Sequence, residues 1–283
     1  MVRLNNSADV RSVAMVCVAV ALILVPQFLK LPSALAVPWL LVAFLACCAS
    51  HVVVHNHNHR VIFTGDTANI AFNLFATVSR GHCASDVHIA HNQNHHLEQG
   101  RDGDWIRPSL GGHGHPALCL ARYIGRATLS MLRERRRLGW DGMWRLPQPF
   151  RTSILMEKVF LPCVIVVLAL HDWRMFLLFC VLPWAASLAW LVGVNYVQHE
   201  GCDPESRFGH SRNFTGAFTN WLLFNNGYHT AHHLDSGQHW SELSEAHRRI
   251  AASIPPALIE ASAARYMVRR YILPKTNGIE IGA

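Results

Sequence analysis

The sequence has few charged residues. Lys, Arg, Asp and Glu make up 15% of its 283 residues, against about 25% in soluble globular domains. Hydrophobic residues make up 51%, and burying so many requires either a large protein core or a lipid bilayer. Because the apolar residues gather in long uncharged runs, the sequence favours the bilayer.

Several familiar signatures are also missing. The eight cysteines form no pair of CxxC units, which argues against a zinc ribbon, and most of them lie in apolar runs as small hydrophobes. The HExxH motif of zincin proteases is absent. The net charge of +7 comes largely from arginines between residues 101 and 151, beside the apolar runs. Membrane topology therefore explains the charge better than nucleic-acid binding does.

Four apolar runs approach the roughly 20 residues that a membrane-spanning helix needs. They cover residues 12–29, 31–50, 153–170 and 175–194. The pattern predicts an all-α integral membrane protein with about four transmembrane helices in two hairpins. We expect a cytoplasmic helical cap that holds a metal site, all within a single domain over residues 1–283. Residues 64–79 are shorter and mixed, which predicts a buried or re-entrant helix.

The basic residues predict the orientation. Ten arginines fall between residues 100 and 152, whereas the two short hairpin loops hold only Lys30 and Arg174. The positive-inside rule then places both termini and the middle segment on the cytoplasmic side of the inner membrane. In a competing interpretation, the first apolar run and Ala34-Leu-Ala36 form a cleavable signal peptide, but this leaves an odd number of spans.

Nineteen histidines are the outlying feature of the composition. Four groups of them, within residues 51–59, 88–96, 195–199 and 229–233, lie just outside apolar runs, all on the same predicted side of the membrane. Imidazole is the commonest metal ligand in proteins, and residues four apart share a helix face. A structural zinc site needs only four ligands and usually includes cysteine. At least nine well-placed imidazoles are enough for two ions with open coordination positions, where dioxygen can bind.

At these positions the sequence resembles the membrane fatty acid desaturase and hydroxylase superfamily, whose histidine boxes have the forms HxxxH, HxxxHH and HxxHH, with an extra NxxxH group. The matching segments span residues 55–59, 91–96, 195–199 and 229–233, and the resemblance extends over roughly residues 10–250. It implies two non-heme iron ions and O2 as co-substrate. The implied iron ligands are His55, His59, His91, His95, His96, His199, His229, His232 and His233. It also implies that Asn195 faces the iron site.

The resemblance implies an O2-dependent oxidoreductase, with a fatty acid (acyl-chain) desaturase of lipid metabolism as the first expectation. The segments NYVQH, HNQNHH and LLFNNGYHTAHH are similar to alkane hydroxylases, so an acyl-chain or alkane hydroxylase (a monooxygenase) is the alternative. The segment from His96 to Trp105 departs from the turn that often follows the second box of acyl desaturases. Expected partners are a lipid-like acyl or hydrocarbon substrate, membrane lipids, and an electron donor such as ferredoxin, rubredoxin or a b-type cytochrome. No nucleic acid is expected.

Two other classes make different predictions. A membrane metal transporter needs ligands in mid-span, and a diheme cytochrome needs axial histidines paired across the bilayer. The histidines instead gather at one interface.

Further polar residues near the boxes have open roles. Three histidines outside the ligand set are candidates for proton delivery or for the wall of a polar cavity: His51, His57 and His88. Carboxylates near the boxes are candidate acceptors for the ligand imidazoles: Asp86, Glu200, Asp203 and Asp235. Three tryptophans are candidates for lining a substrate tunnel: Trp184, Trp190 and Trp221. The basic segment 122–137 suits either membrane topology or docking of an acidic carrier.

Overall fold

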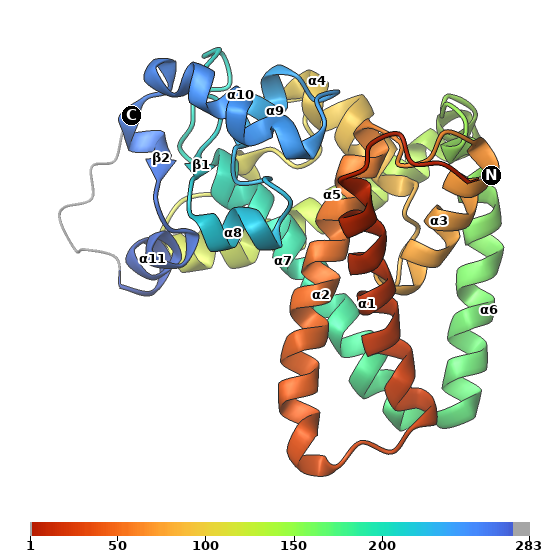
Figure 1. Cartoon of the computed structure of the whole chain (residues 1–283). Helices are drawn as coiled ribbons and strands as arrows, with labels where there is room; N and C mark the ends of the chain where they lie inside the picture. Colours follow the sequence, from red (N-terminus) through yellow and green to blue (C-terminus); the bar gives the residue numbers. More distant parts are fainter. Residues whose placement is uncertain (1, 274–283) are drawn as a thin grey trace.

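The computed structural model describes residues 2–273, whose helices and loops are joined by one short strand pair (Figure 1). The long helices are α1 (Asp9–Phe28), α2 (Ser33–His59), α5 (Pro116–Trp144), α6 (Phe150–Phe176) and α7 (Leu182–His199). The shorter ones are α3 (Asp66–Val78), α4 (His96–Glu98), α8 (Ala217–Leu222), α9 (His229–Leu234), α10 (Leu243–Ile250) and α11 (Ala263–Met267). Strands β1 (Asn213–Phe214) and β2 (Ile259–Glu260) pair in parallel. The all-helical prediction is confirmed.

Three helical stretches are long and apolar enough to cross a membrane: α1, α2 and the 50 residues from Phe150 to His199. The third joins α6 to α7 through the short helix η3 (Leu177–Val181). It bends at Asp172, whose φ of −154° and ψ of 98° are not helical, and Figure 1 shows the chain turning back there. A straight helix of that length would measure about 75 Å, against a bilayer core of about 30 Å. The structure thus shows three apolar stretches where the sequence predicted about four.

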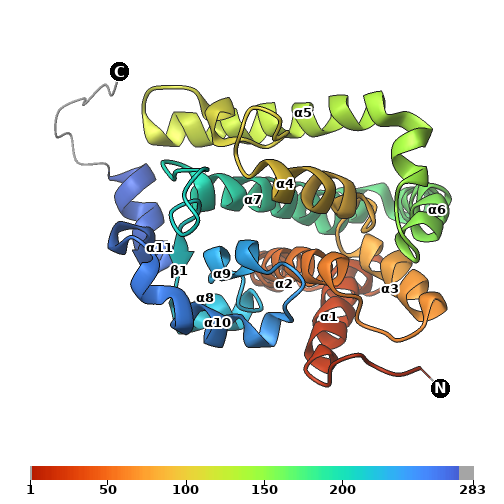
Figure 2. The same ribbon diagram turned by 90° about the horizontal axis from the view of Figure 1, so that it is seen from above.

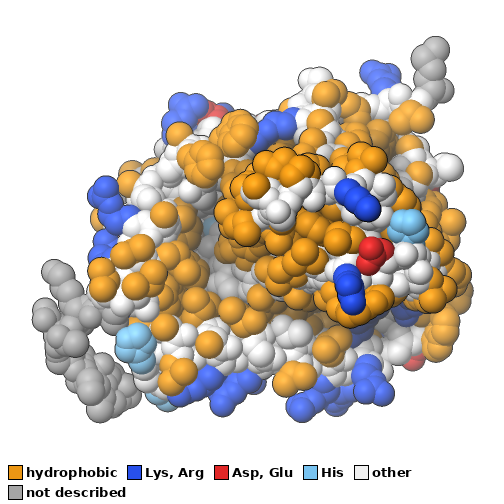
Figure 3. Space-filling view, turned by 90° about the horizontal axis from the view of Figure 1, so that it is seen from below, with side chains coloured by type: hydrophobic (Ala, Val, Ile, Leu, Met, Phe, Trp, Pro, Cys, Tyr) orange, Lys and Arg blue, Asp and Glu red, His pale blue; other side chains and the backbone are white. Residues whose placement is uncertain are grey.

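The outer faces of these stretches are apolar. Val42, Val167 and Leu170 are among their exposed side chains, and the view along the bundle shows mostly apolar side chains on its projecting end, with charged side chains among them (Figure 3). Such a surface is unfavourable in water and is stable against lipid. The short helix predicted at residues 64–79 is α3, and it buries Phe72, Asn73 and Ala76 beside α6.

The basic segment 122–137, for which the sequence predicted no helix, belongs to the long helix α5. Pro116 occupies its first turn, where a missing N–H costs nothing. Cys119, Tyr123 and Ala127 form its buried face, which packs on α7, and Figure 2 shows the two helices running side by side. Arg126, Arg133 and Arg136 are exposed on its other faces. Arg135 is the exception, because it points inward and pairs with Asp86. The structure therefore makes the basic segment the outer wall of the molecule beside α7.

The elements from α8 to α11 gather over one end of the long helices (Figure 1). Phe224, Trp240 and Leu243 from this C-terminal region pack against Val52 and Val53 of α2 in one apolar core. This packing holds α9 beside the last turns of α2. The histidines of segments far apart in sequence are brought together there.

Candidate metal centre

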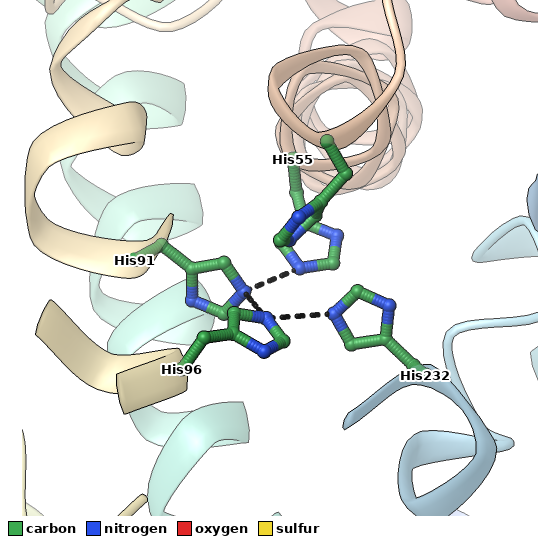
Figure 4. Close-up of side chains that lie close together, drawn as sticks. His55, His91, His96 and His232 are labelled. Carbon is green, nitrogen blue, oxygen red and sulfur yellow. Dashed lines mark hydrogen bonds between the residues drawn. The ribbon is translucent and has the colours of Figure 1, made fainter. Parts of the chain in front are cut away.

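The nine predicted ligands are brought together in two groups. The five-histidine group contains His55, His59, His91, His96 and His232, and the four-histidine group contains His95, His199, His229 and His233. Within each group the candidate ligand nitrogens all lie within 4.8 Å of one another. Figure 4 shows imidazoles of α2, of the second-box segment and of α9 pointing toward a common point.

The spacing of the nitrogens fits metal ligation. In the five-histidine group, Nε2 of His91 lies 2.7 Å from Nε2 of His55 and 2.9 Å from Nε2 of His96. In the four-histidine group, Nε2 of His199 lies 3.2 Å from that of His95 and 3.0 Å from that of His229. Two imidazoles bound at right angles to one ion, each about 2.1 Å away, would have nitrogens about 3 Å apart. The donor sets therefore fit two metal ions.

The second box lies on an unusual helix. Residues His88–His95 form the π-helix η1, which continues into α4. The wider turn of a π-helix brings residues five apart to one side, so His91 and His96 share the five-histidine group. His95 points to the other group. The i, i+4 pairing of His91 with His95 that an α-helix would give is therefore not the pairing in the structure.

The third box is also divided between the groups. His229 and His233 lie four apart on α9 and share the four-histidine group, whereas His232 belongs to the five-histidine group. Figure 4 shows His232 reaching across to His96, whose Nε2 is 3.1 Å away. A six-residue helix thus contributes to both groups and sets the distance between them.

Burial keeps the imidazoles in the form that binds metal. Burial, together with the neighbouring imidazoles, holds the pKa of His91, His229, His232 and His233 well below the usual value. Neutral imidazole is the ligand form. The Nε2 atom of His59 is buried without a hydrogen-bond partner among the described residues, as expected of a nitrogen whose partner is a metal ion.

The family model described as "Fatty acid desaturase" matches residues 32–262, most of the chain and all nine histidines. The chain belongs to the fatty acid desaturase family. A search of curated proteins finds no match. Family membership implies an oxidoreductase, and the two histidine groups are compatible with the metal centre of such an enzyme.

One of the nine imidazoles of this desaturase-family chain has a buried carboxylate partner that the sequence did not reveal. Asp104 Oδ2 accepts a hydrogen bond of 2.7 Å from His95 Nδ1, and both side chains are fully buried. Burial opposes ionisation of Asp104, but His95 and the backbone N–H groups of Ile106 and Gly100 hold its pKa below the usual value. A carboxylate on Nδ1 fixes the tautomer and leaves Nε2 free for metal.

The carboxylates expected in that role lie elsewhere. Asp86 pairs with Arg135, Glu200 pairs with Arg270, and Asp203 and Asp235 are exposed. Asp104 stands in the segment that departs from the acyl-desaturase pattern. The sequence does contain a sign of this carboxylate partner, because the acidic turn Arg101-Asp-Gly-Asp104 follows shortly after the second box.

The remaining predicted residues surround the centre. Asn195 donates a hydrogen bond of 2.7 Å to the Tyr123 hydroxyl and another to the Ile106 carbonyl. His51 accepts a hydrogen bond from Arg80 Nε at 3.0 Å. Residues His57 and His88 contact Ile62 N–H and the Asn58 carbonyl, respectively. The structure groups none of these four with the nine histidines.

A cavity of about 250 Å³ adjoins both groups. His55 and His91 of one group and His229 of the other reach its wall, as does Asn195. Apolar side chains of α5, α7 and η1 form most of the rest, including Ile89, Leu132, Leu188, Leu191 and Val192. Trp105 lines this cavity, whereas its wall includes none of the three candidate tryptophans. An apolar cavity that ends on a metal centre can orient a hydrocarbon chain toward it.

Proposed function

We propose that this chain is a membrane-embedded, O2-dependent oxidase that holds two iron ions on its nine histidines and desaturates a lipid-like acyl chain. The observation that carries the proposal is the apolar cavity whose wall includes histidines of both groups. Bound iron would supply the activation of dioxygen that cleavage of an unactivated C–H bond needs. An acyl-chain or alkane hydroxylase is the second candidate, favoured by the segment Asn195–His199 and its likeness to alkane hydroxylases.

The residues of the chain supply position and a water-poor surrounding. The two histidine groups hold the ions, and Asp104 orients His95. The apolar wall formed by α5 and α7 orders the hydrocarbon chain and excludes water, so that one methylene pair is held near the ions. Forming one double bond and two water molecules from O2 uses two electrons from the substrate and two from a donor. We propose a small carrier for the donor: a ferredoxin, a rubredoxin or a b-type cytochrome.

Metal analysis and product analysis together test the proposed function. The protein would be purified from an aerobically grown, lipid-producing host that is supplied with iron and a reductase. We expect about two iron ions per chain and acyl products that have lost two hydrogens. Gain of one oxygen would instead identify the hydroxylase. Native zinc without oxygen consumption would contradict both and favour the metal transporter.

We further propose that the bent third stretch crosses the membrane twice, which gives four crossings with both termini and the histidine groups in the cytoplasm. The proposal rests on the bend at Asp172 and on the ten arginines between residues 100 and 152. Topology reporters inserted after Lys30 and after Arg174 should report the outer side of the membrane. A reporter inserted after Gly114 should report the cytoplasm. A cytoplasmic signal at Arg174 would contradict the double crossing.

A further inference from the structure

The exposed side of α5 carries leucines and arginines together. Leu118, Leu129 and Leu132 are 51%, 64% and 54% exposed. Arg126 and Arg133 are exposed as well, and their separation of seven residues places them on one side of the helix. Leu129 lies three residues from Arg126 and four from Arg133, so it stands beside both. This side of α5 therefore matches a surface that is apolar and anionic at once.

The positive charge of α5 is not balanced within the helix. Residues Pro116–Leu138 include six arginines and one acidic residue. Two of the six are paired with carboxylates, Arg135 with Asp86 and Arg137 with Glu134. The arginine row consists of three exposed residues that pair with no carboxylate in the described part of the chain: Arg126, Arg133 and Arg136. Uncompensated charge of one sign favours a partner of the other sign.

The helix lies where the chain enters the apolar bundle. Six residues after Trp144, the last residue of α5, the stretch Phe150–His199 begins, which is apolar enough to cross a membrane. Figure 2 shows α5 along its length and α6 end-on, so α5 lies across the direction in which α6 runs. At this end of α5, Trp140 and Trp144 are exposed and lie under the charges of Lys158 and Arg151. Exposed tryptophans beside cations are typical of the depth of the lipid headgroups.

We propose that α5 lies flat on the membrane at the end of the bundle that carries the histidine groups, with its exposed leucines among the lipid chains and the arginine row on anionic phospholipid headgroups. A basic amphipathic helix binds in the plane of the membrane interface in this way. An acidic protein would match the arginines, but not the position of α5 across the entrance to the apolar bundle. The proposal does not depend on the reaction at the metal centre.

The position of α5 also matters for the cavity beside the histidine groups. Leu132 belongs both to the exposed side of α5 and to the apolar wall of that cavity. Thr128 and Met131 of the same helix line the wall beside it. Docking of α5 on lipid would therefore hold the cavity at the depth of the headgroups.

Lipid selectivity tests the arginine row. The full-length protein in a mild detergent would be titrated with phosphatidylglycerol or phosphatidylcholine, and the bound lipid would be measured by native mass spectrometry. The unchanged protein should bind phosphatidylglycerol at least about tenfold more tightly, because each arginine near an anionic surface contributes about fivefold. Arg126→Gln/Arg133→Gln/Arg136→Gln should bind the two lipids about equally. The matched control removes three exposed arginines from other segments and should keep the preference: Arg207→Gln/Arg248→Gln/Arg249→Gln.

The depth of α5 in the bilayer tests the leucines. Leu129→Trp adds one tryptophan to α5, and Arg248→Trp adds one to the exposed side of α10 as the control. In lipid nanodiscs, phospholipids brominated close to the headgroup should quench most of the fluorescence added by Leu129→Trp and little of that added by Arg248→Trp. Equal quenching of the two, or a phosphatidylglycerol preference that survives the triple substitution in α5, would overturn the proposal. An unchanged lipid preference with a raised KM for a reduced ferredoxin would overturn it in favour of docking by an acidic carrier.

Discussion

Replacing His96 with alanine should lower the iron content from about two ions per chain to about one and reduce oxidase activity by more than a hundredfold. Loss of a residue that hydrogen-bonds to a ligand typically lowers metal affinity or activity by roughly 10–100-fold, and loss of the ligand itself should cost more. His96 Nε2 lies close to two other members of the five-histidine group, at 2.9 Å from His91 and 3.1 Å from His232. Metal analysis by mass spectrometry, with oxygen uptake under substrate and reductant, measures both effects.

His199→Ala should produce the same loss through the other group. Its Nε2 is within 3.2 Å of the Nε2 atoms of both His95 and His229. The exposed His113 provides the control, and His113→Ala should retain both ions and full activity. Two ions in His96→Ala would show that His96 is not a required ligand of the five-histidine group.

Asp104→Ala should weaken metal binding at the four-histidine group by about 10–100-fold and lower activity to a similar degree. The substitution leaves His95 Nδ1 buried without its acceptor, so the ring loses its fixed tautomer. It also removes the partners of the Gly100 and Ile106 backbone N–H groups. A chelator-competition titration of the purified protein measures the affinity of each ion separately.

The exposed Asp102 offers a matched control two positions away, and Asp102→Ala should keep the affinity of both ions. A positioning role for Asp104 predicts that only the ion of the four-histidine group is weakened. Equal weakening of both ions would indicate general destabilisation of the fold instead. Unchanged affinity would contradict the role assigned to the carboxylate.

Much of the architecture followed from sequence because it depends on local composition. Long uncharged runs predict apolar helices whatever their neighbours are, and the structure has such helices at α1, α2 and from Phe150 to His199. α5 was missed because its amphipathic pattern is masked by many arginines and by Gly139, which has a φ of 48° and kinks the helix. Its burial against α7 depends on tertiary contacts that no local pattern encodes.

The sequence determined which histidines gather through four motifs that resemble the family's histidine boxes, and the nine residues that this resemblance implies are the nine that the structure places in two groups. Only the tertiary structure decided how the nine divide. The π-helical turn of η1 separates His95 from His91, and the position of α9 across from α2 sends His232 to one group and His229 to the other. The partner of His95 was likewise decided by a turn that folds Asp104 back over nine residues. Sequence spacing fixes neighbours along one helix, whereas these choices depend on where separate elements meet in space.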